Sequence, residues 1–135
     1  MMKLIIGVRG TGKTKQLIEL VNKAAEESKG SVICIEYSNN LNFDITYKAR
    51  LIDATKFNID DAHKLTGFIA GIAASNHDIT DLFIDRALKI CNDDLDALAQ
   101  AINEIDELTQ KAGINCVFTI SADPEACPES LKKFM

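Results

Sequence analysis

The stretch KLIIGVRGTGKTKQ at residues 3–16 decides the expected fold, because it joins a short apolar run to a glycine-rich loop. The loop, Gly7–Thr14, matches the pattern G-x-x-x-x-G-K-[ST] at every fixed position. In a chain of this length a chance match is expected about once in a few hundred sequences. The flanking residues predict a strand over Leu4–Val8 and a helix over Lys13–Ser28. A strand before and a helix after are the context that such a loop requires.

The residue types in this loop suit the binding of phosphate. Its glycines let the backbone curl so that successive N–H groups face one anion, and the following helix directs its positive end to the same place. We expect the Lys13 ammonium to reach the β- and γ-phosphates and the Thr14 hydroxyl to ligate Mg²⁺. The expected contacts with the nucleotide come from Arg9, Gly10, Thr11, Gly12, Lys13 and Thr14.

A magnesium site of this kind also needs a carboxylate opposite Thr14. Asp85 ends the apolar run DLFID (81–85), which predicts a buried strand, and it is the expected metal ligand. The competing interpretation is that Asp85 only caps the next helix.

Strand and helix patterns alternate along the rest of the chain. Apolar, β-branched runs predict strands at 31–37, 81–85 and 114–121, and periodic apolar positions predict helices at 59–75 and 93–112. Small residues in the first of these helices, Gly67 and Gly71 among them, predict close packing on a sheet.

Residues 41–53 alternate between apolar and polar and predict an edge strand that runs on into a parallel RLIDA, after a turn at 38–40. The whole chain therefore predicts one α/β domain over 1–135, a three-layer sandwich with a mostly parallel, roughly five-stranded sheet. A short tail at 123–135 holds both prolines and at most one short helix.

These motifs resemble P-loop NTPases over most of the chain. The guanine-reading motif Asn-Lys-x-Asp is absent, since Asn22-Lys23 lies in the first helix without the aspartate, and the three arginines form no lid-like insert. The order of SVICIEYS, DLFID and VFTIS is similar to the RecA-like branch. That resemblance implies ATP rather than GTP. It also implies a sheet with 114–121 between the first strand and 81–85, and 31–37 beyond.

The resemblance leaves hydrolysis open. Many members of this wider branch have a glutamate after the Walker B aspartate, whereas this chain has Arg86. RecA-like members instead use a carboxylate at the end of the strand after the P-loop helix, which implies a catalytic Glu36 together with Lys13. A glutamate that is only solvated or ion-paired is the alternative, and Asp53 is a second candidate.

Ser121, or Thr119, resembles the polar sensor that touches the γ-phosphate from a neighbouring strand. A serine that merely begins the turn before Asp123-Pro124 explains the position equally well. Arg9 and Arg86 could stabilise phosphate charge or pair with local acids.

The amino-acid composition limits the kinds of partner and the location that we expect. The net charge is −5, from 15 basic and 20 acidic residues, so nucleic acid is an unlikely partner. The first apolar run is too short for a signal peptide or a membrane span, which predicts a cytoplasmic protein. The four cysteines are expected to be buried, reduced thiols, because none forms a CxxC pair.

Three functions remain from the sequence. The first is a small ATP-binding protein with slow Mg²⁺-dependent hydrolysis coupled to a protein partner or to a homo-oligomer. The second is a nucleotide-sensing interaction module that does not hydrolyse ATP. The third is a phosphotransferase whose small acceptor would lie near Tyr47 and Arg50 in the segment 41–58.

Overall fold

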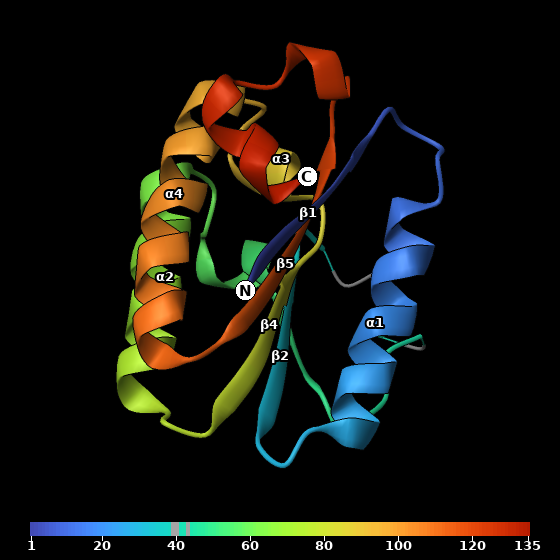
Figure 1. The fold of residues 1–135 in the computed structure, drawn as a ribbon. Coiled ribbons are helices and arrows are strands. Elements are labelled where there is room, and N and C mark those ends of the chain that lie inside the picture. Colours follow the sequence, from blue (N-terminus) through green and yellow to red (C-terminus); the bar gives the residue numbers. More distant parts are fainter. Residues whose placement is uncertain (39–40, 43) are drawn as a thin grey trace.

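Parallel strands form the centre of the molecule (Figure 1). The computed structural model describes residues 1–38, 41–42 and 44–135. Its five strands are β1 (Met2–Gly7), β2 (Ser31–Glu36), β3 (Arg50–Asp53), β4 (Ile79–Ile84) and β5 (Asn115–Ser121). Their order is β1-β5-β4-β2-β3, and every neighbouring pair is parallel. The expected place of β5 between β1 and β4, with β2 beyond, is confirmed.

Helices cover both faces of this sheet, which makes a three-layer α/β sandwich as predicted. In Figure 1, α1 (Lys13–Glu27) lies on one face, and α2 (Ala62–Ser75) and α4 (Leu95–Ala112) lie side by side on the other. The shorter elements are α3 (Ala87–Ile90) and the 3₁₀ turns η1 (Ala54–Phe57), η2 (Pro124–Ala126) and η3 (Glu129–Phe134).

The helix ends follow local capping chemistry. The Asp94 side chain accepts a hydrogen bond from the Ala97 N–H, so α4 begins at Leu95, two residues after the predicted start. At its other end Gly113 has φ 72°, a left-handed conformation that glycine adopts without strain.

Two apolar clusters fill the spaces between the layers. On the α1 face, Leu17 and Val21 pack with Cys34, Phe83 and Val117. The larger cluster lies between the sheet and the α2–α4 layer. All four cysteines are free and buried, as the sequence predicts.

The segment before β3 differs from the prediction. Residues 41, 42 and 44–49 form turns, and only Arg50–Asp53 is a strand; Asn39 and Asn40 of the predicted turn, and Phe43, lie outside the described residues. The predicted alternation is wrong because burial here recurs every four residues, at Leu41, Ile45 and Ala49.

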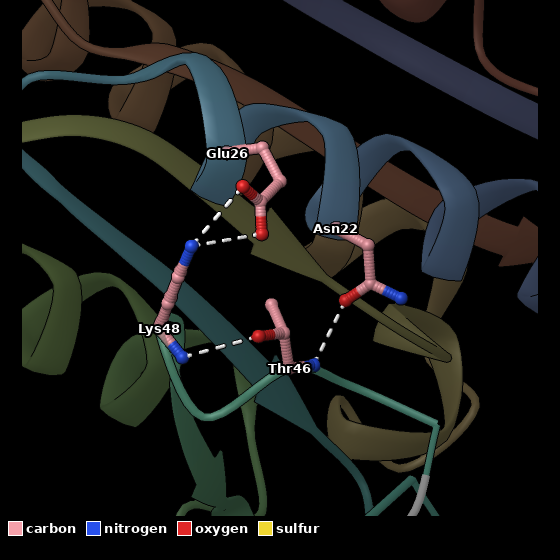
Figure 2. A network of polar contacts seen from close by, with 4 residues as sticks. All are labelled: Asn22, Glu26, Thr46 and Lys48. Carbon is pink, nitrogen blue, oxygen red and sulfur yellow. Dashed lines mark hydrogen bonds and ion pairs between the residues drawn. The ribbon is translucent and has the colours of Figure 1, made fainter.

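Polar contacts fix this segment to α1 (Figure 2). The Asn22 Oδ1 atom accepts from the Thr46 N–H at 2.9 Å, and its Nδ2 donates to the Asp44 carbonyl at 2.9 Å. Lys48 Nζ lies 3.0 and 3.1 Å from the two carboxylate oxygens of Glu26. One side-chain amide thus replaces backbone partners that a strand would have supplied.

The tail is more structured than predicted. It contains two 3₁₀ turns, η2 and η3, rather than at most one short helix. Leu131 has no exposed surface and anchors η3 beside β1 and α4, so these last residues belong to the core packing.

The two glycines of α2 do not pack closely. Gly67 and Gly71 are exposed, and a Cβ atom at either position would have no atom within 4 Å, so the expected close packing is wrong at these two positions, whereas Ala73 packs against the core. Among the described residues, no helix combines the length and apolar character needed to cross a membrane.

Gly30, in the turn between α1 and β2, provides a test of the packing. A Cβ atom there would lie 2.1 Å from the Asp78 carbonyl oxygen and 2.7 Å from Thr80 Cγ2. We expect Gly30→Ala to lower the free energy of unfolding by about 1–3 kcal/mol, because backbone must move. Gly67→Ala should leave stability unchanged or raise it by about 0.5–1 kcal/mol. Denaturant unfolding of both variants measures this, and equal stability of the two would contradict the close approach at Gly30.

Candidate functional site

The Gly7–Thr14 loop curls between the end of β1 and the start of α1. Gly10 and Gly12 have φ values of 86° and 81°, in the left-handed region where side chains are strained. The Thr11 hydroxyl donates to the Val8 carbonyl at 2.8 Å and closes the loop from within. The backbone therefore has the tight, glycine-dependent shape that the sequence predicts.

The Lys13 side chain folds into this loop. Its Nζ donates to the Val8 carbonyl at 2.9 Å and to Thr11 Oγ1 at 3.3 Å, and the residue is only 9% exposed. Burial lowers the pKa of the Lys13 ammonium, while the nearby Asp85 carboxylate opposes that change. The structure thus holds a poorly hydrated ammonium group inside the loop.

Asp85 and Thr14 meet although they are 71 residues apart in sequence. The Thr14 hydroxyl lies 3.2 and 3.3 Å from the two carboxylate oxygens of Asp85. The geometry disfavours the interpretation that Asp85 only caps the next helix, because Arg86 occupies the N-cap position of α3. A hydroxyl and a carboxylate are the hard oxygen ligands that Mg²⁺ prefers, so this donor pair fits that ion.

Thr119 holds the same carboxylate from β5. Its hydroxyl donates to Asp85 Oδ1 at 2.6 Å and accepts from the Arg86 N–H at 2.8 Å. Because the hydroxyl already uses its hydrogen as a donor and its oxygen as an acceptor, Thr119 acts as a positioning residue for Asp85. Ser121, two residues further along β5, is exposed and is the better placed of the two to contact a ligand.

Arg86 has an unusual backbone and a fixed side chain. Its φ of 55° is left-handed. The guanidinium lies 5.5 Å from the centre of the Tyr37 ring, and Nη2 donates to Ser38 Oγ at 3.3 Å. Both partners follow β2, so Arg86 connects the ends of β4 and β2.

A cavity of about 510 Å³ opens above the loop. Its walls bring together most of the predicted nucleotide contacts, namely Arg9, Gly10, Gly12, Lys13, Thr14 and Ser121. Thr11 is absent from these walls, in line with its contacts inside the loop. The remaining wall residues are Lys15, Arg86, Leu88, Lys89, Asp93 and Thr119. Lys15, Leu88, Lys89 and Asp93 were not predicted, and only their closeness in sequence to Thr14 and Asp85 could have suggested them.

Polar side chains form a row across the carboxyl ends of four strands. In the strand register, Phe118 pairs with Ile84 and Ile84 with Ile35, so the next residues along, Thr119, Asp85 and Glu36, follow one another across the sheet. Asp53 on β3 pairs directly with Glu36. Adjacent strands lie about 4.8 Å apart, so three carboxylates stand on successive strands.

Glu36 differs from the other carboxylates of this row in its hydrogen bonding. It is 2% exposed, and Oε2 accepts from the Leu41 N–H at 3.1 Å, while Oε1 has no hydrogen-bond partner within the described part of the chain. Burial, together with the charges of Asp53 and Asp85, raises the pKa of the Glu36 carboxyl to about 7. The Leu41 N–H and the Arg86 charge act in the opposite direction.

Asp53, the second catalytic candidate, has a local structural role. Its Oδ1 accepts from the Thr55 N–H at 2.9 Å and from the Thr55 hydroxyl at 2.6 Å, which caps η1. Glu36 is therefore the better candidate for chemistry at this end of the sheet.

Comparisons with known proteins add no family: no family model matches the chain, and no curated protein matches it.

The raised pKa of Glu36 predicts how stability depends on pH. Between pH about 4.5 and 7 the folded protein keeps a proton that the unfolded chain has released, so the free energy of unfolding falls as pH rises through this window. At pH 8 we expect Glu36→Gln to be more stable than the wild type by on the order of 1–3 kcal/mol, and near pH 4 to be equal to it.

Urea unfolding across this pH range measures the difference. Glu107→Gln, on the exposed face of α4, is the matched control for the loss of a carboxylate. A constant difference between Glu36→Gln and the wild type at all pH values would contradict the prediction.

Proposed function

We propose that this protein binds ATP with Mg²⁺ as a P-loop NTPase of the RecA-like kind and hydrolyses it slowly. The observation that supports this most is the contact between Thr14 and Asp85, which brings a Walker A threonine to a strand-terminal aspartate. The sequence motif and the long-range contact are independent, since nothing local in the chain forces the two to meet. ATP is preferred over GTP because of the branch resemblance.

The loop residues supply most of the binding. Backbone N–H groups of the loop and the start of α1 would hold the phosphate oxygens, with Lys13 as the charge at the β- and γ-phosphates. Thr14 and Asp85 would hold the Mg²⁺ ion, which supplies charge neutralisation on the phosphates. Ser121 and Arg9 line the same cavity and would contact the nucleotide from β5 and from the loop.

Hydrolysis depends on the row of carboxylates. Glu36 lies one strand from Asp85 and is buried, and its Oε1, which has no hydrogen-bond partner among the described residues, would orient a water molecule. Arg86 occupies the position after Asp85 and offers a cation at the wall of the cavity. Because Arg86, and not a glutamate, follows Asp85, we propose slow turnover, with the nucleotide state signalled to a partner protein or a second copy of the chain.

The location we propose is the cytoplasm. The four cysteines are free, which fits a reducing compartment. Net charge −5 makes nucleic acid an unlikely partner.

Phosphate release with Mg-ATP tests the proposal directly. We expect Lys13→Ala to weaken ATP binding at least tenfold, because it removes the loop's cation. Glu36→Gln should keep ATP binding and lower phosphate release at least tenfold. Calorimetry measures the affinity, and a phosphate-binding fluorescent sensor measures the rate.

Two outcomes would contradict it. If wild type binds ATP but releases no more phosphate than Lys13→Ala, the protein is a nucleotide-sensing module rather than an ATPase. If neither ATP nor GTP binds at millimolar concentration, the nucleotide assignment itself is wrong.

The role of the Arg86 guanidinium can be tested while the backbone conformation is kept. Asn tolerates a left-handed φ better than most residues, so Arg86→Asn removes the guanidinium while keeping the conformation. We expect unchanged folding and a tenfold or greater loss of phosphate release. Arg86→Gly is the matched control, since it relieves backbone strain and should show the same loss. Full activity in both variants would exclude a role for the guanidinium.

A further inference from the structure

A second cavity, of about 200 Å³, lies at the ends of β2 and β3. Glu36, Arg50, Asp53, Lys56 and Phe57 are among its walls. It has no wall residue in common with the cavity above the Gly7–Thr14 loop, which lies at the ends of β1, β5 and β4. Glu36 lies in the wall of the second cavity, and the strand register places it next to Asp85 across the sheet.

Glu36 gives this second cavity an unsatisfied acceptor. The residue is 2% exposed, and its Oε1 has no donor among the residues that the structure describes. A buried carboxylate oxygen without a donor costs free energy, so such an atom marks a place where a hydrogen-bond donor is expected to bind. A hydroxyl group of a ligand would satisfy it.

The walls of this cavity also supply positive charge. Arg50 and Lys56 are exposed, and in the described ranges neither is part of an ion pair. Asp53 is engaged with Thr55, so it does not neutralise them through a direct hydrogen bond. Phe57, 56% exposed, adds an apolar surface. The cavity thus combines a hydrogen-bond acceptor with cations in its walls.

Size limits the ligand to a small metabolite. Sites for drug-sized ligands measure about 300–1,000 Å³, and this cavity is smaller. Asn42, which also lines this cavity, follows Leu41, whose N–H donates to Glu36 at 3.1 Å. Further along the chain, Thr46 and Lys48 are bound to Asn22 and Glu26 of α1 (Figure 2).

We propose that the second cavity binds a small hydroxyl-bearing anion, such as a hydroxy acid or a phosphorylated alcohol, and that this molecule accepts the γ-phosphoryl group. This inference rests on the proposed nucleotide function. The anion pairs with Arg50 and Lys56, and the hydroxyl donates to Glu36 beside Asp85.

The transfer forms one bond to phosphorus and breaks another. The acceptor hydroxyl oxygen forms a bond to the γ-phosphorus, and the bond from that phosphorus to the β–γ bridging oxygen breaks. ADP leaves with the electron pair, and the hydroxyl proton passes to the Glu36 carboxylate.

Binding of probes to the full chain without nucleotide tests the site first. Glycerate and glycerol 3-phosphate have both features, glycerol has only hydroxyls, and propionate has only the anion. By calorimetry or ligand-observed NMR at millimolar concentration, we expect the first two to bind at least tenfold more tightly than the last two. Arg50→Glu and Lys56→Glu should each weaken that binding at least tenfold. Lys111→Glu, exposed on α4, should not.

Transfer of label from γ-³²P-ATP tests the reaction. The expected product is the phosphorylated probe, and Glu36→Gln should lower its formation at least a hundredfold with ATP affinity unchanged. If ATP binds and label appears only as free phosphate, the acceptor proposal is overturned while the ATPase stands. Probes that bind without being labelled overturn the transfer step. Failure of ATP itself to bind overturns the nucleotide function and the transfer together, and is recognised in the calorimetry with ATP alone.

Discussion

The buried carboxylate of Asp85 is the constraint on which the rest of this site depends. It is 2% exposed and receives hydrogen bonds from Thr14 at the start of α1 and Thr119 on β5. A charge removed from water to this extent must be paired, so the ends of β4, β5 and α1 are held at fixed positions. The Thr119 hydroxyl also binds the Arg86 N–H, which extends the same constraint to the chain after β4.

The chemistry that we propose lies along the sheet from this point. Toward β1 the loop and Lys13 would hold the phosphates with backbone N–H groups and one cation. Toward β3 the next carboxylate, Glu36, has one oxygen without a partner among the described residues and a pKa raised by burial. Whether that oxygen orients water or an acceptor hydroxyl decides between hydrolysis and phosphoryl transfer, and Arg86 contacts residues on the Glu36 side.

The local sequence pattern was sufficient to predict the strands and helices whose apolar residues recur with a clear period. It failed at a segment whose conformation is set by contacts with a distant part of the chain. The four buried strands and the helices after the loop were predicted to within a few residues, because their apolar residues pack into the two clusters on the faces of the sheet. At 41–49 the same reasoning gave a strand, since Ile45, Tyr47 and Ala49 alternate with polar residues. Asn22 instead holds this segment in turns, and Tyr47 is 92% exposed.

The sequence by itself determined the α/β class, the shape of the glycine loop and the pairing of Lys13 and Thr14 with it, since these depend on residues close together in the chain. The resemblance implied the order of the strands, but only the tertiary structure decided which side chains meet at their ends. The register of β2, β4 and β5 placed Thr119, Asp85 and Glu36 side by side, so that Thr119 donates a hydrogen bond to Asp85. Asp53, on β3, instead accepts from Thr55 and caps η1. Register depends on burial summed over the whole sheet, so no single stretch of sequence contains it.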